Sequence, residues 1–262
     1  MSGPLPGVVV LDLSRILAGP WATQVLADFG AEVIKIEHPR GGDDTRQWGP
    51  PYLADATGQS TSESAYYLSA NRGKRSVAID FSRPEGQELV RRLATGADVL
   101  IENFKVGGLD RYGLGYDAIG KLNPRLIYLS ISAFGQDGPD AAKPGYDAMI
   151  QGMGGLMSLT GAPDGTPGGG PQKVGVAVAD LMCGMYAVAG ILAALQERAR
   201  SGLGQHIDLS LLDTQVAWLA NQAMNYLVTG QPPTRKGTAH PNIVPYQAFA
   251  TADGHLMLAV GN

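Results

Sequence analysis

The stretch VVVLDLSRILAGPWATQVLADFGAEVIKIE, residues 8–37, decides the fold class. Its two ends, 8–13 and 32–37, are short runs rich in β-branched residues, which are typical of buried strands. Between them, Gly19-Pro20 opens a helical pattern that stops at Gly30, and proline fits there because the first N–H groups of a helix have no intrahelical partner. A strand, a helix and another strand in succession predict a parallel sheet covered by helices.

The same alternation continues through the first half of the chain. Further strands are predicted at 76–80, 98–102 and 126–131, and the capping-box spacing of Ser82-Arg-Pro-Glu85 predicts a helix that ends near Gly96. The predicted fold class is therefore α/β, with a Rossmann-like, mostly parallel sheet flanked by helices. The first turn lacks the pattern G-x-G-x-x-G, so a dinucleotide site is not expected.

The second half predicts helices and then a new domain. Residues 180–196 are apolar nearly all round, which predicts a helix buried on most sides, and a second long helix is predicted at 209–228. A Gly/Pro-rich linker follows, and the segment 246–260 has the signature of a β-hairpin turning at Asp253-Gly254. Because one hairpin cannot bury its own face, we expect a large domain over 1–228 and, over 229–262, a linker and the incomplete start of a small α+β domain.

Composition excludes several classes of protein. The net charge of -4 argues against nucleic-acid or anionic-membrane binding, and the apolar run 183–195 is short and rich in Gly and Ala for a membrane span. No signal peptide is recognisable, and the single cysteine fits a reducing compartment, so we expect a cytoplasmic protein, or a mitochondrial-matrix protein in a eukaryote. Four histidines without close spacing and one thiol predict no metal site.

Sheets of this class bind ligands at the carboxyl ends of their strands, which directs attention to segments 14–20, 38–46, 80–82 and 103–111. Basic residues gather at these positions and nearby. They favour an anionic ligand such as a phosphate, although solvated loop charges would give the same pattern. These residues are Arg40, Arg46, Arg72, Lys74, Arg75, Lys105 and Arg111.

One carboxylate stands out in the second half. Asp180 ends the apolar run Val174-Gly-Val-Ala-Val-Ala and precedes a helical pattern. A carboxylate in such surroundings is either a helix N-cap or a functional group that N–H donors hold ionised. Two neighbouring residues, Tyr146 and Asp147, allow an equally plain interpretation as a core aromatic and another N-cap.

Several motifs together resemble one family, the class III CoA-transferases (CaiB/BaiF type), which include formyl-CoA transferase and succinyl-CoA-dependent dicarboxylate transferases. The resemblance extends along essentially the whole chain and covers about two thirds of a usual family chain, so we expect a C-terminally truncated member. The motifs are Leu11-Asp-Leu-Ser-Arg-Ile-Leu-Ala-Gly-Pro20, Gly30-Ala-Glu-Val-Ile-Lys-Ile-Glu37, Gly42-Asp-Asp-Thr-Arg46, Asn71-Arg-Gly-Lys-Arg-Ser76, Glu102-Asn-Phe104, Leu109-Asp-Arg111, Gly145-Tyr-Asp147 and Val174–Asp180.

The resemblance implies a role for each motif. Asp180 would be the nucleophile, passing through an aspartyl anhydride and an aspartyl-CoA thioester while CoA moves from an acyl-CoA donor to a carboxylic acid. No tightly bound cofactor is implied, and the partners would be acyl-CoA, a small carboxylic acid and a second copy of the chain in an interlocked homodimer. The implied CoA contacts are Leu17 and Ala18 at the pantetheine, Ile79, Asp80, Phe81 and Ser82 at the adenine, Asn103, Phe104, Lys105 and Arg111 at the phosphates, and Pro144, Gly145, Tyr146 and Asp147 at the reacting end.

One position departs from the family pattern, and two rival functions stay open. His38 stands where some members carry arginine, which would make a phosphate contact pH-dependent.

An α-methylacyl-CoA racemase-like isomerase would need a base where this chain has Tyr146, and tyrosine, with a pKa near 10, suits that task poorly. The second rival is a truncated, inactive family member. Residues 146–152 and His240-Pro241 favour succinyl-CoA and a dicarboxylate as substrates without identifying them.

Overall fold

The computed structural model describes residues 3–261 and divides them into two compact units. Unit 1 runs through Gly145 and resumes over Asp180–Thr214; unit 2 comprises Tyr146–Ala179 and the described chain from Gln215 onward. The expected boundary between a large domain over 1–228 and a second domain over 229–262 stays a prediction.

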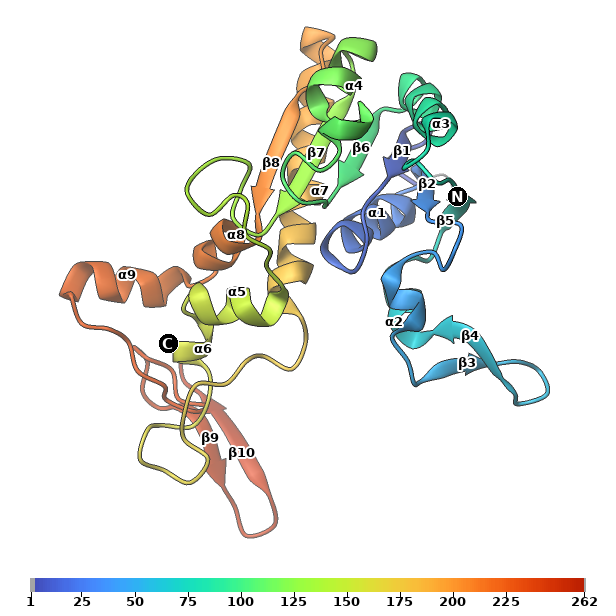
Figure 1. Ribbon diagram of the computed structural model, residues 1–262. Helices are drawn as coiled ribbons and strands as arrows, with labels where there is room; N and C mark the ends of the chain where they lie inside the picture. Colours follow the sequence, from blue (N-terminus) through green and yellow to red (C-terminus); the bar gives the residue numbers. More distant parts are fainter. Residues whose placement is uncertain (1–2, 262) are drawn as a thin grey trace. The chain divides into compact units, whose positions relative to one another are not determined.

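Unit 1 is built on a parallel sheet, as the sequence predicts (Figure 1). The described residues give it six strands in the order β5-β2-β1-β6-β7-β8, and every adjacent pair is parallel. This confirms the α/β, Rossmann-like fold class. The strands are β1 (Val9–Asp12), β2 (Glu32–Glu37), β5 (Lys74–Ala78), β6 (Val99–Glu102), β7 (Ile127–Ser132) and β8 (His206–Ser210).

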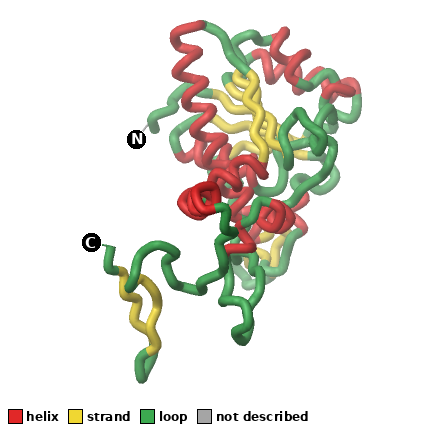
Figure 2. The backbone as a smooth tube through the Cα atoms, turned by 90° about the vertical axis from the view of Figure 1, so that its left-hand side faces the viewer, coloured by secondary structure: helices red, strands yellow, loops and turns green. Residues whose placement is uncertain are grey.

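Helices cover both faces of the sheet. On one face, α3 (Pro84–Thr95) and α4 (Tyr116–Leu122) bury their apolar sides in a core with Leu11, Leu100 and Tyr128. On the other face lie α1 (Ala18–Asp28) and the long helix α7 (Val178–Ser201), which runs beside the strands in Figure 2. Successive side chains of β1 point to opposite faces of the sheet. Leu11 packs into the core beneath α3 and α4, whereas Asp12 faces α1 and accepts a hydrogen bond from the Thr23 hydroxyl. This layering leaves the strand ends as the place where loops can form a site.

Three local predictions are wrong. Residues 209–228 are not one helix: they contain the end of β8, then α8 (Leu211–Ala217) and α9 (Ala220–Thr229), separated by a break. The Ser82 capping box does not form, because its hydroxyl donates to Asp80 and the N-cap of α3 is Arg83. Asp180 is not an N-cap either, since it lies within the first turn of α7, which begins at Val178.

Shorter elements complete the two units. Unit 1 also contains the 3₁₀ turns η1 (Asp44–Gln47) and η2 (Asp110–Tyr112), the hairpin β3 (Tyr52–Ala54) and β4 (Ser60–Ser64), and α2 (Ala65–Ser69). Unit 2 contains α5 (Asp147–Met153), α6 (Leu156–Leu159) and the antiparallel pair β9 (Tyr246–Ala250) and β10 (His255–Ala259). The predicted hairpin near the end of the chain is therefore confirmed.

The long helix α7 is less buried than predicted. Cys183, Ala187 and Ile191 are buried, whereas Met185 and Tyr186 are each 40% exposed. Its length and apolar composition alone would suffice to cross a bilayer, a test that core helices of soluble proteins also pass. The helix therefore has one face in the core of unit 1 and one open apolar face.

Candidate active site at the carboxyl ends of the strands

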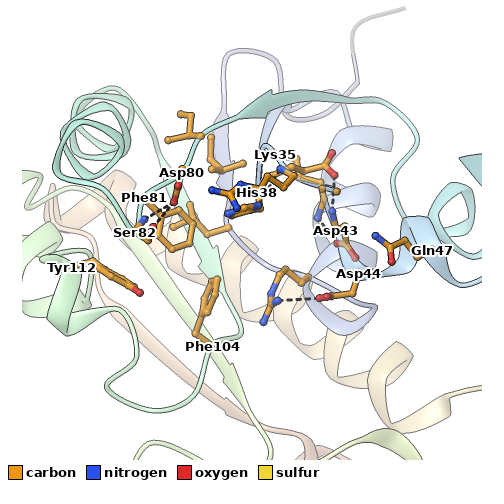
Figure 3. Close-up of a pocket in the computed structure, with 18 of the residues that line it drawn as sticks. Lys35, His38, Asp43, Asp44, Gln47, Asp80, Phe81, Ser82, Phe104 and Tyr112 are labelled. Carbon is orange, nitrogen blue, oxygen red and sulfur yellow. Dashed lines mark hydrogen bonds and ion pairs between the residues drawn. The ribbon is translucent and has the colours of Figure 1, made fainter. Parts of the chain in front are cut away.

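A cavity of about 590 Å³ lies in unit 1 where β1, β2, β5 and β6 end (Figure 3). Its size is that of a small-molecule site. All four predicted rim segments contribute to it. The lining residues are Leu13, Arg15, Lys35, Ile36, Glu37, His38, Arg40, Gly41, Gly42, Asp43, Asp44, Gln47, Trp48, Ile79, Asp80, Phe81, Ser82, Phe104 and Tyr112.

One wall of the cavity is aromatic. Phe81 packs edge-on against Phe104 and Tyr112, with ring centroids 5.7 and 5.8 Å apart. The guanidinium of Arg15 lies 5.1 Å from the centroid of Phe104. Figure 3 shows this wall opposite Asp43, Asp44 and Gln47. Aromatic rings and a guanidinium plane are suited to holding a planar, electron-rich ring such as a purine.

The mouth of the cavity carries charges of both signs. Arg15 pairs with Asp44 at 3.0 Å, and both side chains are about half exposed. The N–H of Arg40 donates to Nδ1 of His38 at 3.1 Å, which leaves the other ring nitrogen of His38 for a ligand or solvent. The Ser82 hydroxyl holds the pKa of Asp80 below its usual range. The guanidinium groups of Arg15 and Arg40 and the second ring nitrogen of His38 can therefore meet an anionic ligand at this mouth.

Beneath the cavity, charged groups are buried in pairs. Lys35 and Asp43 are each at most 1% exposed and lie 2.9 Å apart. Burial opposes ionisation of Glu37, but hydrogen bonds from Arg46, Ser76 and the N–H of Asp43 lower its pKa to about 2. Glu37 therefore stays ionised at neutral pH, and these paired side chains form the hydrogen-bonded base of the cavity.

Most of the basic residues noted in the sequence are engaged with protein carboxylates. Four form ion pairs, and Arg111 lies 4.6 Å from the ring centroid of Tyr112. Arg40 lines the cavity described above, and Lys105 lines a separate polar pocket of about 180 Å³. Because most of these cations are already paired with protein carboxylates, their number alone is weak evidence for an anionic ligand. The four pairs are Arg46 with Glu37, Arg72 with Asp28, Lys74 with Asp12 and Arg75 with Glu32.

The smaller pocket contains a buried acid that sequence reasoning missed. Glu102 is 6% exposed, accepts the N–H of Phe104 at 2.8 Å and shares a hydrogen bond with Ser130. Burial raises the pKa of Glu102 to about 7, against the hydrogen bonds that lower it. The Ser130 hydroxyl lies 3.0 Å from Nε2 of His206, whose own pKa is lowered by burial. This acid is poised to change its protonation state near neutral pH.

Asp180 lies half-buried in the first turn of α7. A carboxylate is favoured there because the first-turn N–H groups carry partial positive charge. On the next turn, Cys183 is buried, which raises the pKa of its thiol to about 12 and makes it a poor nucleophile. Within residues 3–261, no group of three or more His, Cys, Asp or Glu side chains could hold a metal ion.

In unit 2, Asp147 holds the segment that leads to Asp180. Its carboxylate accepts the N–H of Ala179 and the amide of Gln151, each at 2.8 Å. Gln151 in turn accepts the N–H of Val174 at 2.8 Å. Asp147 is the first residue of α5 rather than its N-cap, which is Tyr146. The core-aromatic interpretation of Tyr146 is also wrong, because that side chain is 68% exposed.

Comparison with known proteins decides the family. The model of CoA-transferase family III matches residues 5–262. The chain belongs to this family. A succinate–glutarate CoA-transferase of Agrobacterium fabrum is 60% identical over 259 residues, and a succinyl-CoA:glutarate CoA-transferase of Mus musculus is 49% identical over 259 residues. The crystal structure of a CAIB/BAIF family protein from Brucella suis superposes with a TM-score of 0.91 at 55% identity, covering 100% of this chain and 67% of that one.

This family III chain is shorter than these relatives. The matches cover 99% of it but only 64% of the Agrobacterium protein and 57% of the mouse protein. The family and fold expected from the sequence motifs are confirmed. The activity, substrates and assembly of a complete protein are separate questions.

The structure brings together only some of the residues predicted to bind CoA. His38, Ile79, Asp80, Phe81, Ser82 and Phe104 line the large cavity of this family III chain, whereas Lys105 lines the smaller pocket. Leu17 and Ala18 are buried where α1 begins, and Asn103 bonds to the backbone of Arg15. Pro144 and Gly145 end the first segment of unit 1, and Arg111 is exposed. Arg15 and Asp44 lie within the predicted rim segments without having been predicted as CoA contacts. Tyr112, one residue beyond the segment 103–111, was missed, although its position after β6 was a usable signal.

Proposed function

We propose that the protein transfers CoA from an acyl-CoA donor to a small carboxylic acid, with Asp180 as the nucleophile. The observation that carries the proposal is the family match over residues 5–262. The half-buried position of Asp180 in the first turn of α7 supports it, because the helix N-terminus favours the ionised form that must attack. Glutarate as acceptor and succinyl-CoA as donor are suggested by what the two similar relatives are called.

The proposed reaction conserves the energy of the thioester. A carboxylate oxygen of Asp180 attacks the acyl carbonyl, and the C–S bond breaks to give a mixed anhydride and CoA thiolate. The thiolate attacks the aspartyl carbonyl, which releases the donor acid and leaves an aspartyl-CoA thioester. The acceptor carboxylate then displaces the thiolate, and the thiolate attacks the acceptor carbonyl of the new anhydride to regenerate Asp180. Each step exchanges one activated acyl group for another, so excluding water preserves the activation.

The large cavity suits the nucleotide end of CoA. We propose that the adenine lies against Phe81, Phe104 and Tyr112 and that Arg15, His38 and Arg40 face the phosphates. The aromatic wall, the unpaired ring nitrogen of His38 and the volume of about 590 Å³ support this placement. Asn103 and Arg111 are then supporting residues of the loop rather than direct phosphate ligands.

We also propose that the protein works as a homodimer. In unit 2, several apolar side chains are open to solvent, among them Leu227 at 71%, Val228 at 79% and Met257 at 59%. Such exposure is typical of surfaces that associate. Light scattering coupled to size exclusion would give twice the chain mass if the proposal is correct and the chain mass if it is not.

The function is tested by incubating the protein with succinyl-CoA and a panel of carboxylates that includes glutarate, followed by chromatography of the CoA esters. New acyl-CoA is expected with the wild type and not with Asp180→Ala. Undiminished transfer by that variant would disprove the nucleophile. Exchange of an α-proton with deuterated water without acyl transfer would instead favour the isomerase, and CoA binding without turnover would favour an inactive family member.

A further inference from the structure

The turn between β1 and α1 contains a strained residue. Ile16 has a φ of 71°, in the left-handed region. For a β-branched residue this conformation costs about 1–2 kcal/mol. A strained conformation persists only where the surroundings over-determine it. Arg15, just before Ile16, lines the large cavity, and Leu17, just after it, is the predicted pantetheine contact.

Two polar side chains hold this turn from the side of β2. The ammonium group of Lys35 donates to the carbonyl oxygen of Ser14 at 2.8 Å and pairs with Asp43 at 2.9 Å. The other carboxylate oxygen of Asp43 accepts the N–H of Ile16 at 3.3 Å. The ion pair therefore bonds to the backbone two residues before Ile16 and to Ile16 itself. Both side chains are almost fully buried, so water does not compete for these bonds.

A third side chain holds the same turn from the side of β6. Asn103 accepts the N–H of Arg15 at 2.8 Å, and its amide donates to the carbonyl oxygen of Arg15 at 2.7 Å. This pairing engages the N–H and the carbonyl oxygen of the same residue, as a neighbouring strand would, and so fixes the two peptide groups on either side of Arg15. Ser14, Arg15 and Ile16 are thus all held, each by a side chain that follows or lies within another strand of the sheet.

A buried ion pair is by itself weak evidence of a contribution to stability. Burying two charges costs several kcal/mol per ion, and replacing such a pair by neutral groups is often neutral or stabilising. Lys35 and Asp43 are almost fully buried, and their polar bonds converge on the turn and on η1, where Asp43 also accepts the N–H of Thr45. The pair is therefore better explained by the geometry that it imposes than by the free energy of folding.

We infer that Lys35, Asp43 and Asn103 are positioning residues that clamp residues 14–16 in the strained conformation required for CoA binding. The clamp sets where Arg15 stands at the cavity mouth and how the chain enters α1. This inference rests on the proposed function for its CoA consequence, but the clamp itself can be measured without CoA. Releasing it lets Ile16 relax out of the left-handed region, which moves the wall of the cavity.

The test is the double variant Lys35→Met with Asp43→Asn. It removes both charges together, so the net charge is unchanged. It breaks the bond from Lys35 to Ser14 and replaces the carboxylate that accepts from Ile16 by a weaker, neutral acceptor, while asparagine still accepts from Thr45. The matched control is Arg200→Met with Glu197→Gln, which makes the same kind of change at an exposed ion pair of α7. Hydrogen–deuterium exchange of the peptide containing residues 13–20 and thermal melting are measured with and without CoA. The Kd for CoA is measured by titration of the free protein.

We expect the double variant to melt near the wild-type temperature, to exchange faster over residues 13–20 and to bind CoA roughly five- to thirtyfold more weakly, the fold-change equivalent to a strain of about 1–2 kcal/mol. Adding Ile16→Gly should restore most of the affinity, because glycine adopts a positive φ without strain. Neither a loss of stability nor a loss of charge would be rescued in this way. The exposed-pair control should match the wild type.

The outcomes separate the two claims. Unchanged exchange over residues 13–20 in the double variant, or weakened CoA binding that Ile16→Gly does not improve, would overturn the clamp. If the wild type binds no CoA, the proposed function fails, and faster exchange in the double variant with restoration by Ile16→Gly would still support the clamp.

Discussion

Substituting Glu102 by glutamine tests the electrostatics of the buried pocket most sharply. The carboxylate is 6% exposed, and burial, together with Asp110 and Asp208, raises its pKa from 4.5 to about 7 despite hydrogen bonds from Ser130 and Phe104. The folded protein therefore binds a proton more tightly than the unfolded chain. Between pH 4.5 and pH 7 the contribution of Glu102 to the free energy of unfolding therefore falls as pH rises.

The expected size follows from the two pKa values. The difference between 4.5 and about 7 corresponds to about 3 kcal/mol, at about 1.4 kcal/mol for each pKa unit. Glutamine keeps the oxygen that accepts from Phe104, and its amide can donate to Ser130. It cannot ionise, so the Glu102→Gln protein escapes this loss. Its stability relative to the wild type should grow by about 3 kcal/mol from pH 4 to pH 8.

Urea unfolding of both proteins at one-unit pH intervals measures the difference. Glu197→Gln makes the same substitution at an exposed glutamate on α7 and is the control for the effect of the substitution itself. A Glu102→Gln difference that is flat between pH 4 and pH 8 would refute the reasoning, since the carboxyl would then titrate alike in the folded and unfolded states.

Three further predictions follow from single contacts. A methyl group on Gly86 would lie 2.0 Å from the carbonyl oxygen of Asp80, so Gly86→Ala should destabilise the protein by about 1–3 kcal/mol and weaken CoA binding, as melting and titration with CoA would show. Asp147→Ala leaves the N–H of Ala179 unpaired and should cost about 1–2 kcal/mol in urea unfolding, with Asp147→Asn costing less because an acceptor remains. The thiol of Cys183, buried with a pKa of about 12, should resist a thiol-reactive dye in the native protein and react at once in denaturant.

The sequence predicted those parts of the fold whose signal is local. Runs of β-branched residues predict the strands at 8–13 and 32–37, and in the structure β2 spans Glu32–Glu37 as predicted. Strand β8 was missed because His206-Ile-Asp-Leu-Ser210 contains three polar residues, and its strand conformation depends on pairing with β7. Its polar side chains are accounted for by non-local partners, such as Ser130 beside His206.

The site was predictable in position but not in detail. Topology alone places the strand ends together, so the rim segments could be named in advance and do meet around one cavity. The partner of each side chain could not be read from the sequence. Asp147 looked like a cap for its own helix but accepts from Ala179, 32 positions away. The family resemblance places Asn103 at the phosphates, and its bonds to the backbone of Arg15, 88 positions away, could not be foreseen.

Mass spectrometry of the protein after brief incubation with succinyl-CoA tests the central claim most directly. If Asp180 is the nucleophile, the peptide that contains it gains the mass of CoA as a thioester, the gain disappears when a dicarboxylate acceptor is added, and Asp180→Ala never acquires it. A protein that transfers CoA to an acceptor while Asp180 stays unmodified, or an adduct on another residue, would contradict the account.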